Sequence, residues 1–595
     1  LAMVIAAAGD LVLGLVLLRR VGDAARRIDT PYLGGLVVCG LALVVTLVAA
    51  KFDPAAMASG VYRHGVPRLS EKDGQKVLYY QDGKTASVAV FDSLDSRRAV
   101  ATNGKVDAGI RMADDGEPAA DELTMVLAAA APLLHHPNPR VAAVIGFGSG
   151  LSTHTLLADP RLERVDTIEI EPAMIEGARL FGKHVERAYS DPRSHLHIED
   201  ARTYFAANRS RYDIILSEPS NPWVSGVASL FSTEFYEFIP HHLAPGGLLV
   251  QWVQLYEIND ELVGSVVHAL SRTFADYRVY LAGDTDMLIV ARADGPVEDL
   301  HLEALSSPEL QRTLQRVHIA TPNDLLAHQI GDRASMGPLF AAVSRRVNSD
   351  YYPVLSLEAP RARFEKATAT MLTHLPTADL PYREIIGGIA PPDAQTLFEN
   401  EVYGYTGKVA LAARLAHALR SGEPLAKFQD DGAAGPQIDY LRERVGQCRA
   451  ATDPSIAMSN LVDIASQTLP YLAEASLRGV WIEPAWIHCE AQAPELRTLL
   501  RLFDAMARRD GATQQALALE LLARPGAVRA LGLRDWLLRA AMLGAIGAGD
   551  FAAVEQIEAA HGWSIPSGGT DRAYRAWSIN YAMQRRAMGE ASPAR

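Results

Sequence analysis

Polar side chains follow the apolar segments of this sequence in an order that suits a nucleoside. The glycine-rich segment GFGSG (146–150) comes directly after the apolar run 141–145, and Glu169, Asp200 and Glu218 end or follow three later segments. Glycines let a ligand approach the backbone, and the start of a helix offers unpaired N–H groups. A carboxylate can accept hydrogen bonds from both hydroxyls of a ribose, and another can accept one from an adenine amino group. The pattern therefore predicts a nucleoside site.

The segments that carry these residues alternate between strand and helix patterns from residue 140 onward. Strands are expected at 141–145, 165–171, 195–200, 212–219, 248–255 and near 278–292, with helices such as 172–183 and 201–208 between the early ones. Such alternation produces a parallel, doubly wound sheet, which binds ligands at the carboxyl ends of its strands. Asp200 could instead cap the helix 201–208, and Glu169 could also be a capping carboxylate. We expect the nucleoside to be bound by Gly146, Gly148, Ser149, Gly150, Glu169, Asp200 and Ala201.

The order of the motifs resembles that of a known family. GFGSG, IEIE, IEDA and YDIILSEPSNPW, the last followed by SLFSTEFY, resemble the spermidine synthase (polyamine aminopropyltransferase) family over about residues 75–295. The chain as a whole resembles the membrane-fused bacterial members of that family. The resemblance implies transfer of an aminopropyl group from decarboxylated S-adenosylmethionine, with release of methylthioadenosine. It also implies that Glu169 binds the ribose and Asp200 the adenine.

Several positions depart from the family's pattern. Ser149 stands where the family carries an Asp that holds the donor's amine, and Glu218 stands where it carries its catalytic Asp. Asn221 replaces a second Asp, which binds the polyamine, and Asp107 replaces a glutamine. The Tyr-His-Glu segment that follows the family's Asp-Glu pair is missing after the pair 121–122. Much of the negative charge that a polycationic acceptor needs is therefore lost, although Asp107 and the pair 121–122 could partly restore it.

These departures favour an enzyme that cleaves intact S-adenosylmethionine. A Ser at 149 would not repel the α-carboxylate of that donor, as an Asp would, and its hydroxyl could donate a hydrogen bond to that carboxylate. The donor's own carboxylate could then attack the propyl carbon in an intramolecular cyclisation, which gives methylthioadenosine and an amino-lactone, with Glu218 orienting the amino group. Three alternatives stay open: an aminopropyltransferase that makes a polyamine with Glu218 as its base, a methyltransferase, and a non-catalytic nucleoside sensor.

The reaction itself is expected to involve side chains beyond the nucleoside site. Glu218 and Asn221 are expected to be catalytic, and the substrate pocket is expected to include Asp107, Asp121, Trp223 and Tyr256. Trp223 lies in an expected lid loop, 220–232, where it could stack on the ligand or pack under the loop. Tyr256 could likewise belong to the core. The histidine pairs have no carboxylate or cysteine partner at a ligand spacing, so no metal is expected.

Two apolar segments open the chain. Residues 1–18 and 33–50 are each about 18 residues long, which is enough to cross a hydrocarbon core of about 30 Å. We therefore predict transmembrane helices, the end of a larger membrane region, rather than buried core helices. The chain is expected to be a multi-pass protein of the inner (cytoplasmic) membrane, with the lipid bilayer as a partner. Because S-adenosylmethionine is cytoplasmic, the catalytic domain is expected to face the cytoplasm, although the basic linker 19–32 favours the opposite side.

The composition indicates several folded domains. The 595 residues carry a formal net charge of −13, and 21% are charged, which excludes a disordered chain and argues against nucleic-acid binding. We predict an α/β protein with N-terminal transmembrane helices (1–52), a linker and small β subdomain (53–139), a doubly wound Rossmann-like domain of the methyltransferase and spermidine synthase fold (140–364), and an α-helical region of hairpins (365–595). The resemblance further implies a homo-oligomer.

Overall fold

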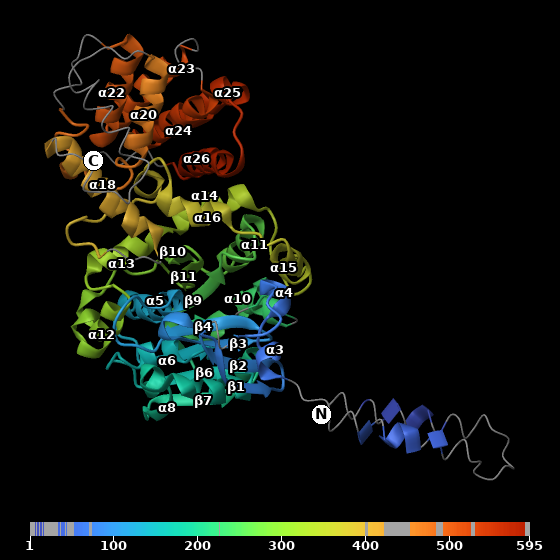
Figure 1. Cartoon of the computed structure of the whole chain (residues 1–595). Coiled ribbons are helices and arrows are strands. Elements are labelled where there is room, and N and C mark those ends of the chain that lie inside the picture. Colours follow the sequence, from blue (N-terminus) through green and yellow to red (C-terminus); the bar gives the residue numbers. More distant parts are fainter. Residues whose placement is uncertain are drawn as a thin grey trace.

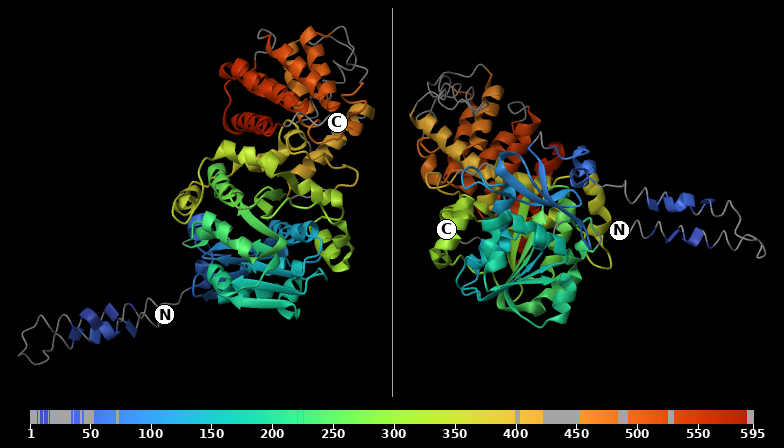
Figure 2. Two further views of the ribbon diagram at one scale, coloured as in Figure 1. Left: turned by 180° about the vertical axis from the view of Figure 1, so that it is seen from behind. Right: turned by 60° about the horizontal axis from the view of Figure 1, so that its bottom comes forward.

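The protein combines an α/β unit with a helical unit (Figure 1). The computed structural model describes residues 53–589 except 71–73, 220, 225, 399–402, 422–452, 484–491 and 525–529, together with scattered positions between 6 and 44. The strands and the helices between them form the lower part of Figure 1, and the helices from residue 404 onward lie above them. Figure 2 shows the same division from two further sides.

The prediction of N-terminal transmembrane helices was wrong. Among the residues that the structure describes, no helix is long and apolar enough to cross a membrane. A span needs about 20 consecutive apolar residues in one helix. Most positions of the predicted segments 1–18 and 33–50 lie outside the described residues. The inner-membrane location and the lipid-bilayer partner rested on those helices and lose that basis.

A small antiparallel sheet precedes the main α/β unit. Its strands are β1 (Lys76–Asp82), β2 (Ser87–Asp92), β3 (Arg97–Thr102) and β4 (Lys105–Arg111), paired in that order. The tight turn between β3 and β4 is formed by Asn103 and Gly104, whose φ angles are both positive at 49° and 77°. Asn-Gly is the pair that such a hairpin turn favours. A Cβ at position 104 would also lie 2.5 Å from the Cα of Gly60, so only glycine fits there.

The larger sheet carries the predicted doubly wound α/β pattern. The described residues form an eight-stranded sheet in the order β12-β10-β11-β9-β8-β5-β6-β7. Its strands are β5 (Val141–Ile145), β6 (Arg164–Glu169), β7 (Ser194–Ile198), β8 (Tyr212–Ser217), β9 (Leu243–Gln254), β10 (Asp276–Ala282), β11 (Asp286–Arg292) and β12 (Gln329–Asp332). Strands β9, β8, β5, β6 and β7 are mutually parallel, whereas β10, β11 and β12 are added antiparallel.

Both faces of this sheet are buried, as the prediction of a doubly wound fold requires. Ala142 and Val144 of β5 pack in one hydrophobic core, and Ala143 and Ile145 of the same strand pack in another. Helices α5 (Ala120–His135), α6 (Leu151–Leu156) and α7 (Pro172–Ala178) contribute to the first core, and α9 (Ala201–Ala207), α10 (Thr233–Phe238) and α11 (Asp260–Ser271) contribute to the second. Alternate side chains of a strand point to opposite faces, so β5 is apolar throughout.

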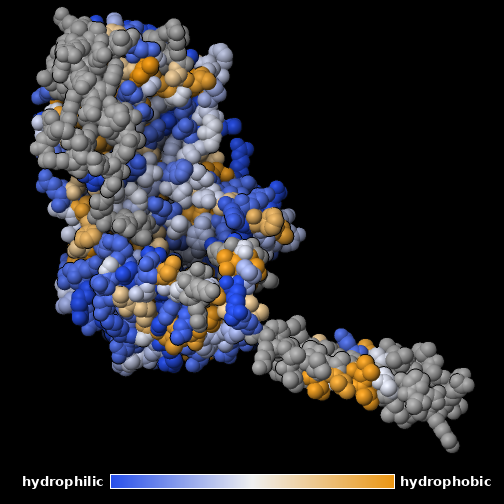
Figure 3. All heavy atoms as spheres, viewed as in Figure 1, coloured by the Kyte–Doolittle hydropathy of each residue, from blue (hydrophilic) through white to orange (hydrophobic). Residues whose placement is uncertain are grey.

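The remaining part of the chain is mainly helical. It includes α12 (Pro308–Arg316), α13 (Pro322–His328), α14 (Arg333–Val343), α15 (Val354–Phe364), α16 (Thr370–His374), α18 (Gly404–Ser421), α20 (Pro454–Ser466), α22 (Pro494–Ala507), α23 (Gly511–Leu522), α24 (Leu531–Gly547), α25 (Phe551–His561) and α26 (Gly569–Ala587). Most of the face seen in Figure 3 is hydrophilic, although Leu357 and Phe364 of α15 are 72% and 90% exposed.

The last helix is fixed to α14 by a hydrogen bond. The indole N–H of Trp577 in α26 donates to the carbonyl of Ser335 at 2.8 Å.

Candidate active site

A cavity of about 440 Å³ runs along the edge of the large sheet at which the parallel strands end. Its lining follows the strand order: Asp286 at the start of β11, Trp252 on β9, Glu218 after β8, Gly146 after β5, Glu169 at the end of β6 and Asp200 after β7. Asp286 reaches this edge because it pairs with Gln254, the last residue of β9. Neighbouring strands lie about 4.8 Å apart, so these groups form a row with Glu218 near its middle.

Glu169 lies in the interior at the end of β6, where two backbone amides meet its carboxylate. The N–H of Phe147 donates to Oε2 at 2.9 Å, and the N–H of Glu171 donates to Oε1 at 2.8 Å. Burial raises the pKa of Glu169 above its ordinary value, and these hydrogen bonds oppose the rise. Each carboxylate oxygen has a second lone pair. The group can therefore accept two hydroxyls that approach side by side, as those of a ribose do.

Asp200 caps α9, which is the alternative that the sequence left open. The N–H of Thr203 donates to Asp200 Oδ1 at 2.9 Å, and the Thr203 hydroxyl donates to the same oxygen at 3.1 Å. Asp200 and Ala201 both line the cavity as well. Because the cap uses Oδ1, capping and contact with a ligand through Oδ2 are compatible.

The glycine loop lies directly against the end of β8. Gly146 and Gly148 line the cavity and have positive φ angles of 96° and 52°. A Cβ at position 146 would lie 3.2 Å from the carbonyl oxygen of Glu218. Glycine therefore lets the backbone of this loop approach both a ligand and the end of β8.

Ser149 and Gly150 lie behind this loop and are not part of the cavity lining. Ser149 is fully buried, and its hydroxyl lies 3.1 Å from the sulfur of Met125 and accepts from the N–H of Leu151 at 3.3 Å. Gly150 has a φ of 89° and directly precedes α6. The predicted contact between the Ser149 hydroxyl and a donor carboxylate is therefore not formed by this arrangement.

Glu218 combines burial with a position near the middle of the row. The hydroxyl of Ser152 donates to its Oε1 at 3.0 Å. Burial raises the pKa of Glu218 from 4.5 to about 7, and the hydrogen bond from Ser152 acts in the opposite direction. A carboxyl with such a pKa can take up and release a proton near neutral pH.

Asp107 reaches the cavity from the small sheet because β4 contains a bulge. Val100 pairs with Ala108 and Ala101 pairs with Val106, so Asp107 is an additional residue opposite β3. A bulge of this kind changes the direction of a side chain and is common near active sites. The structure thus brings Asp107, which the sequence placed in the substrate pocket, into the cavity lining.

The Asp107 carboxylate is held by three polar groups. Asn221 donates from Nδ2 to Oδ1 at 3.0 Å, and the hydroxyl of Thr102 donates to Oδ2. The ammonium of Lys105 lies 3.5 Å from Oδ1. Asn221 has a φ of 65°, which asparagine tolerates better than most residues. Asn221 therefore connects the segment after β8 to the small sheet across the cavity.

Two more carboxyls lie in the interior toward the β11 end. Asp286 accepts from Trp252 Nε1 at 2.9 Å and from the hydroxyl of Thr124 at 3.0 Å. Burial and the charge of Asp286 raise the pKa of Asp121 to about 7, and burial also raises the pKa of Asp286. This end of the cavity therefore attracts cations. Within the described residues, no group of three or more His, Cys, Asp or Glu side chains could hold a metal ion.

The two aromatic candidates differ in position. Tyr256 lines the cavity, whereas Trp223 is not among its lining residues. The Trp223 ring packs against the hydrophobic core, and the guanidinium of Arg363 lies 4.3 Å from the ring centroid. For Trp223 the arrangement is thus the packing alternative that the sequence left open.

Three residues in or beside the cavity were not predicted from the sequence: Asp286, Glu171 and Lys105. Asp286 directly precedes the apolar run 287–291, whose antiparallel pairing brings it to the ligand-binding edge. Glu171 accepts from the N–H of Thr85 at 2.6 Å and thereby ties the small sheet to the start of α7. Lys105 follows an Asn-Gly pair, which is a hairpin signal, but the burial of its side chain depends on packing between distant segments.

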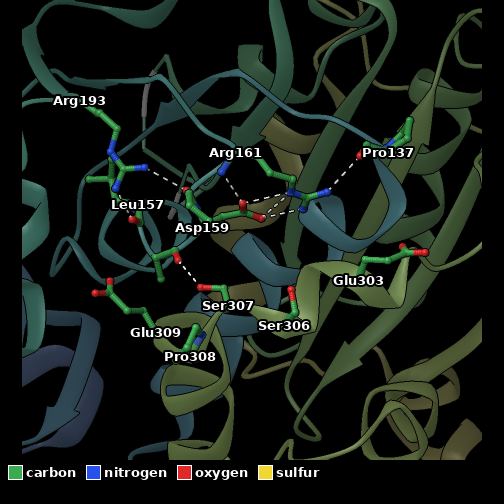
Figure 4. A pocket seen from close by; sticks show the side chains of 12 residues that line it. Pro137, Leu157, Asp159, Arg161, Arg193, Glu303, Ser306, Ser307, Pro308 and Glu309 are labelled. Atoms are coloured by element: carbon green, nitrogen blue, oxygen red, sulfur yellow. Dashed lines mark hydrogen bonds and ion pairs between the residues drawn. The ribbon is translucent and has the colours of Figure 1, made fainter.

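A second hollow, of about 790 Å³, lies outside this row between α12 and the segment after α6 (Figure 4). The guanidinium groups of its two arginines already form hydrogen bonds with other groups of the chain. Arg161 donates to Asp159 and to the carbonyl of Leu133, both at 2.7 Å, and Arg193 donates to the carbonyl of Leu157 at 2.6 Å. These guanidinium groups hold chain segments together, so the hollow is a weaker candidate than the row of strand ends.

Comparisons with known proteins point to the same part of the chain. Residues 125–283 match the family model described as the spermine/spermidine synthase domain. The polyamine aminopropyltransferase of Caldicellulosiruptor saccharolyticus is 27% identical over 207 residues, which are 35% of this chain and 71% of that protein. Putrescine N-methyltransferase 3 of Nicotiana tabacum is 26% identical over 204 residues, which are 34% of this chain and 50% of that protein.

A solved structure, the spermidine synthase from Thermotoga maritima, is 20% identical and gives a TM-score of 0.33, covering 39% of this chain and 78% of the other. The family model and the curated relatives confirm the resemblance seen in the motifs. The matched residues 125–283, which include Gly146, Glu169, Asp200 and Glu218, are similar to a spermidine synthase domain.

Proposed function

We propose that this protein is a transferase that moves an aminopropyl group from decarboxylated S-adenosylmethionine to an amine, with release of methylthioadenosine. The observation that carries the proposal is the order of charges along the sheet edge. A proton-accepting carboxyl, Glu218, lies between an end suited to a nucleoside and an end where Asp121 and Asp286 are buried. Both relatives described above act on polyamine substrates by their names, which agrees with a cationic acceptor.

The donor's nucleoside is proposed to lie at the β6 and β7 end. There Glu169 accepts the ribose hydroxyls, and Asp200 with Ala201 lies beside the adenine. Gly146 and Gly148 allow the ligand to approach the backbone. This orientation directs the sulfonium group toward Glu218, the next strand end along the row.

In the proposed step the neutral nitrogen of the acceptor amine attacks the propyl carbon that is bonded to the sulfonium. The new C–N bond forms while the C–S bond breaks, and the electron pair of that bond stays on sulfur, which gives methylthioadenosine. The nitrogen then carries a surplus proton, and ionised Glu218 accepts it. Since the sulfonium is already a good leaving group, positioning of the nucleophile is the main task of the protein.

The acceptor is proposed to be an amine with a second, charged nitrogen. Asp121 and Asp286 lie at the end where that ammonium would bind, and an ammonium removed from water needs carboxylate partners. The same two carboxyls would repel the α-carboxylate of intact S-adenosylmethionine. The decarboxylated donor therefore fits this cavity better than the intact one.

Cyclisation of intact S-adenosylmethionine, which the sequence favoured, loses its main support. That prediction depended on a loss of acceptor carboxylates and on a Ser149 that would tolerate the donor carboxylate, but Asp107, Asp121 and Asp286 line the cavity and the Ser149 hydroxyl contacts Met125. Methyl transfer keeps one specific observation in its favour, the tobacco relative named as a putrescine N-methyltransferase. Both reactions, like the nucleoside sensor, are outcomes of the same test. The predicted homo-oligomer and cytoplasmic placement stay predictions.

The test is to incubate the full chain with three mixtures and identify the products by mass spectrometry. The mixtures are decarboxylated S-adenosylmethionine with putrescine, intact S-adenosylmethionine with putrescine, and intact S-adenosylmethionine alone. We expect methylthioadenosine only in the first. Glu218→Gln should abolish it, whereas Glu163→Gln, which removes a surface carboxylate paired with Arg140, should not.

Other products would contradict the proposal in distinguishable ways. Methylthioadenosine from intact S-adenosylmethionine alone would establish cyclisation. S-adenosylhomocysteine from the second mixture would establish a methyltransferase. No product in any mixture, with nucleoside binding intact, would favour the sensor.

A further inference from the structure

Lys105 is the first residue of β4, and its side chain is buried beside the cavity. The residue is 2% exposed, although lysine is almost never fully buried unless its ammonium is paired. The ammonium lies 3.5 Å from Asp107 Oδ1, and it has no hydrogen-bond partner among the residues that the structure describes. Keeping an ammonium out of water in this way is costly, so its position calls for a function.

The surroundings of this ammonium resemble a site for a ligand cation. The Lys105 nitrogen lies 5.7 Å from the ring centroid of Trp223 and 5.6 Å from that of Tyr256. A carboxylate together with two aromatic rings is a combination that recognises ammonium groups. Asp107 and Tyr256 also line the cavity. The protein thus places its own ammonium in a subsite fit for the ammonium of a substrate.

The carboxylates at the β11 end of the cavity limit how many ammonium groups of an acceptor can be paired. Asp121 and Asp286 line the cavity, and neither forms an ion pair within 4 Å in the described part of the chain, although the nearby charge of Lys105 opposes the rise of both pKa values. The contact of Lys105 with Asp107 is closer, with 3.5 Å between the ammonium and Oδ1. One ligand ammonium can therefore pair with Asp121 and Asp286, but a further one would have to compete with Lys105.

We infer that Lys105 sets the length of the acceptor: its ammonium fills the cation subsite at Asp107, so that the cavity takes a diamine and discriminates against a triamine. The inference rests on the proposed function, because it concerns the acceptor of the same reaction. In the bound diamine the reacting nitrogen lies near Glu218 and the other nitrogen lies near Asp121 and Asp286. The additional ammonium of a triamine would have to displace Lys105 from Asp107 to find a carboxylate partner at this end of the cavity.

Titration calorimetry of the full chain tests this without turnover. Putrescine and spermidine are titrated separately, with methylthioadenosine present to fill the donor end. The wild-type protein is expected to bind putrescine at least as tightly as spermidine. Lys105→Met keeps the length of the side chain and removes its charge, so the spermidine-to-putrescine ratio of binding constants should rise about tenfold or more. Lys105→Arg keeps the charge and should leave the ratio unchanged.

Two results would overturn the inference: wild-type protein that binds spermidine tenfold more tightly than putrescine, or a ratio that Lys105→Met does not change. If circular dichroism shows that Lys105→Met does not fold, Lys105→Gln is used in its place. The ratio of the two binding constants in the wild-type protein tests the inference without any variant. Wild-type protein that binds neither amine also overturns it. Protein with the expected length preference that transfers no aminopropyl group would leave the inference standing and contradict the proposed function alone.

Discussion

Replacing Glu218 with glutamine should abolish turnover and, at the same time, stabilise the protein above neutral pH. Burial raises the pKa of Glu218 from 4.5 to about 7 in the native state, whereas the unfolded chain has the ordinary value. Native protein therefore favours the protonated carboxyl. The stability that protonation provides is fully present below about pH 4.5 and is lost as the pH rises through about 7. Glutamine stays neutral and avoids the cost of a buried charge.

The magnitude follows from the size of the pKa shift. One pKa unit corresponds to about 1.36 kcal/mol, so a rise of about 2.5 units corresponds to at most about 3 kcal/mol at pH 8. Part of the Glu218 side chain faces the cavity, where water screens its charge, and this lowers the expected gain to about 1–3 kcal/mol. A Tm shift of about 2–4 °C for each kcal/mol is ordinary for domains of this size.

The assay is the thermal midpoint of the α/β unit, measured from pH 4.5 to 8.5 for wild type, Glu218→Gln and the surface control Glu163→Gln. The midpoints of wild type and Glu218→Gln should coincide near pH 4.5 and separate toward pH 8, with the variant more stable. The control should follow wild type throughout. A Glu218→Gln variant that is less stable than wild type at pH 8, or equal to it at every pH, would refute the reasoning about Glu218.

Three further outcomes are expected. Glu169→Gln should weaken methylthioadenosine binding about tenfold or more in calorimetry, because hydrogen bonds to charged groups are worth about 1.5–3 kcal/mol; unchanged affinity would remove Glu169 from the site. Asp286→Asn should weaken putrescine binding while leaving methylthioadenosine binding as it is, and an equal loss for both ligands would indicate damage to the fold instead. Arg539→Met should destabilise the protein by about 3 kcal/mol in urea unfolding, because it removes this buried guanidinium from Asp379 and leaves the buried Asp535 with Arg575 at 3.5 Å; a loss no larger than that of an exposed ion pair would contradict this.

The sequence was sufficient for the features that depend on local pattern. Apolar runs followed by glycines or carboxylates placed Gly146, Glu169, Asp200 and Glu218 at strand ends, and the parallel order of the strands brought them into one row. Such residues can be predicted because strand ends in this topology always meet at one edge. The alternation of strands and helices likewise predicted that both faces of the sheet are buried.

Features that depend on side-chain direction could not be predicted in this way. Ser149 occupies the expected position in the loop, but its hydroxyl turns toward Met125, which is 24 residues away in the chain. Asp107 was placed in the pocket by the family resemblance and not by the local pattern, because it reaches the cavity through a bulge, and a one-residue shift of strand register has no signal in the sequence. The position of Asp286 depends on antiparallel pairing of β11 with β9, which the pattern of a parallel sheet does not contain.

The prediction of membrane-spanning helices was also wrong. It rested on the hydropathy of two segments, whereas a span is one apolar helix about 30 Å long. Among the described residues no helix meets both conditions. The function proposed for the cavity does not depend on such helices.

The central claim is that a single displacement joins the donor's propyl carbon to an acceptor amine. The most direct measurement is the molar ratio of methylthioadenosine to alkylated amine, formed by the full chain from decarboxylated S-adenosylmethionine and putrescine. We expect a ratio of one to one at every time point, with no methylthioadenosine when putrescine is left out. Methylthioadenosine formed at the same rate without putrescine, or in excess of the alkylated amine, would contradict it.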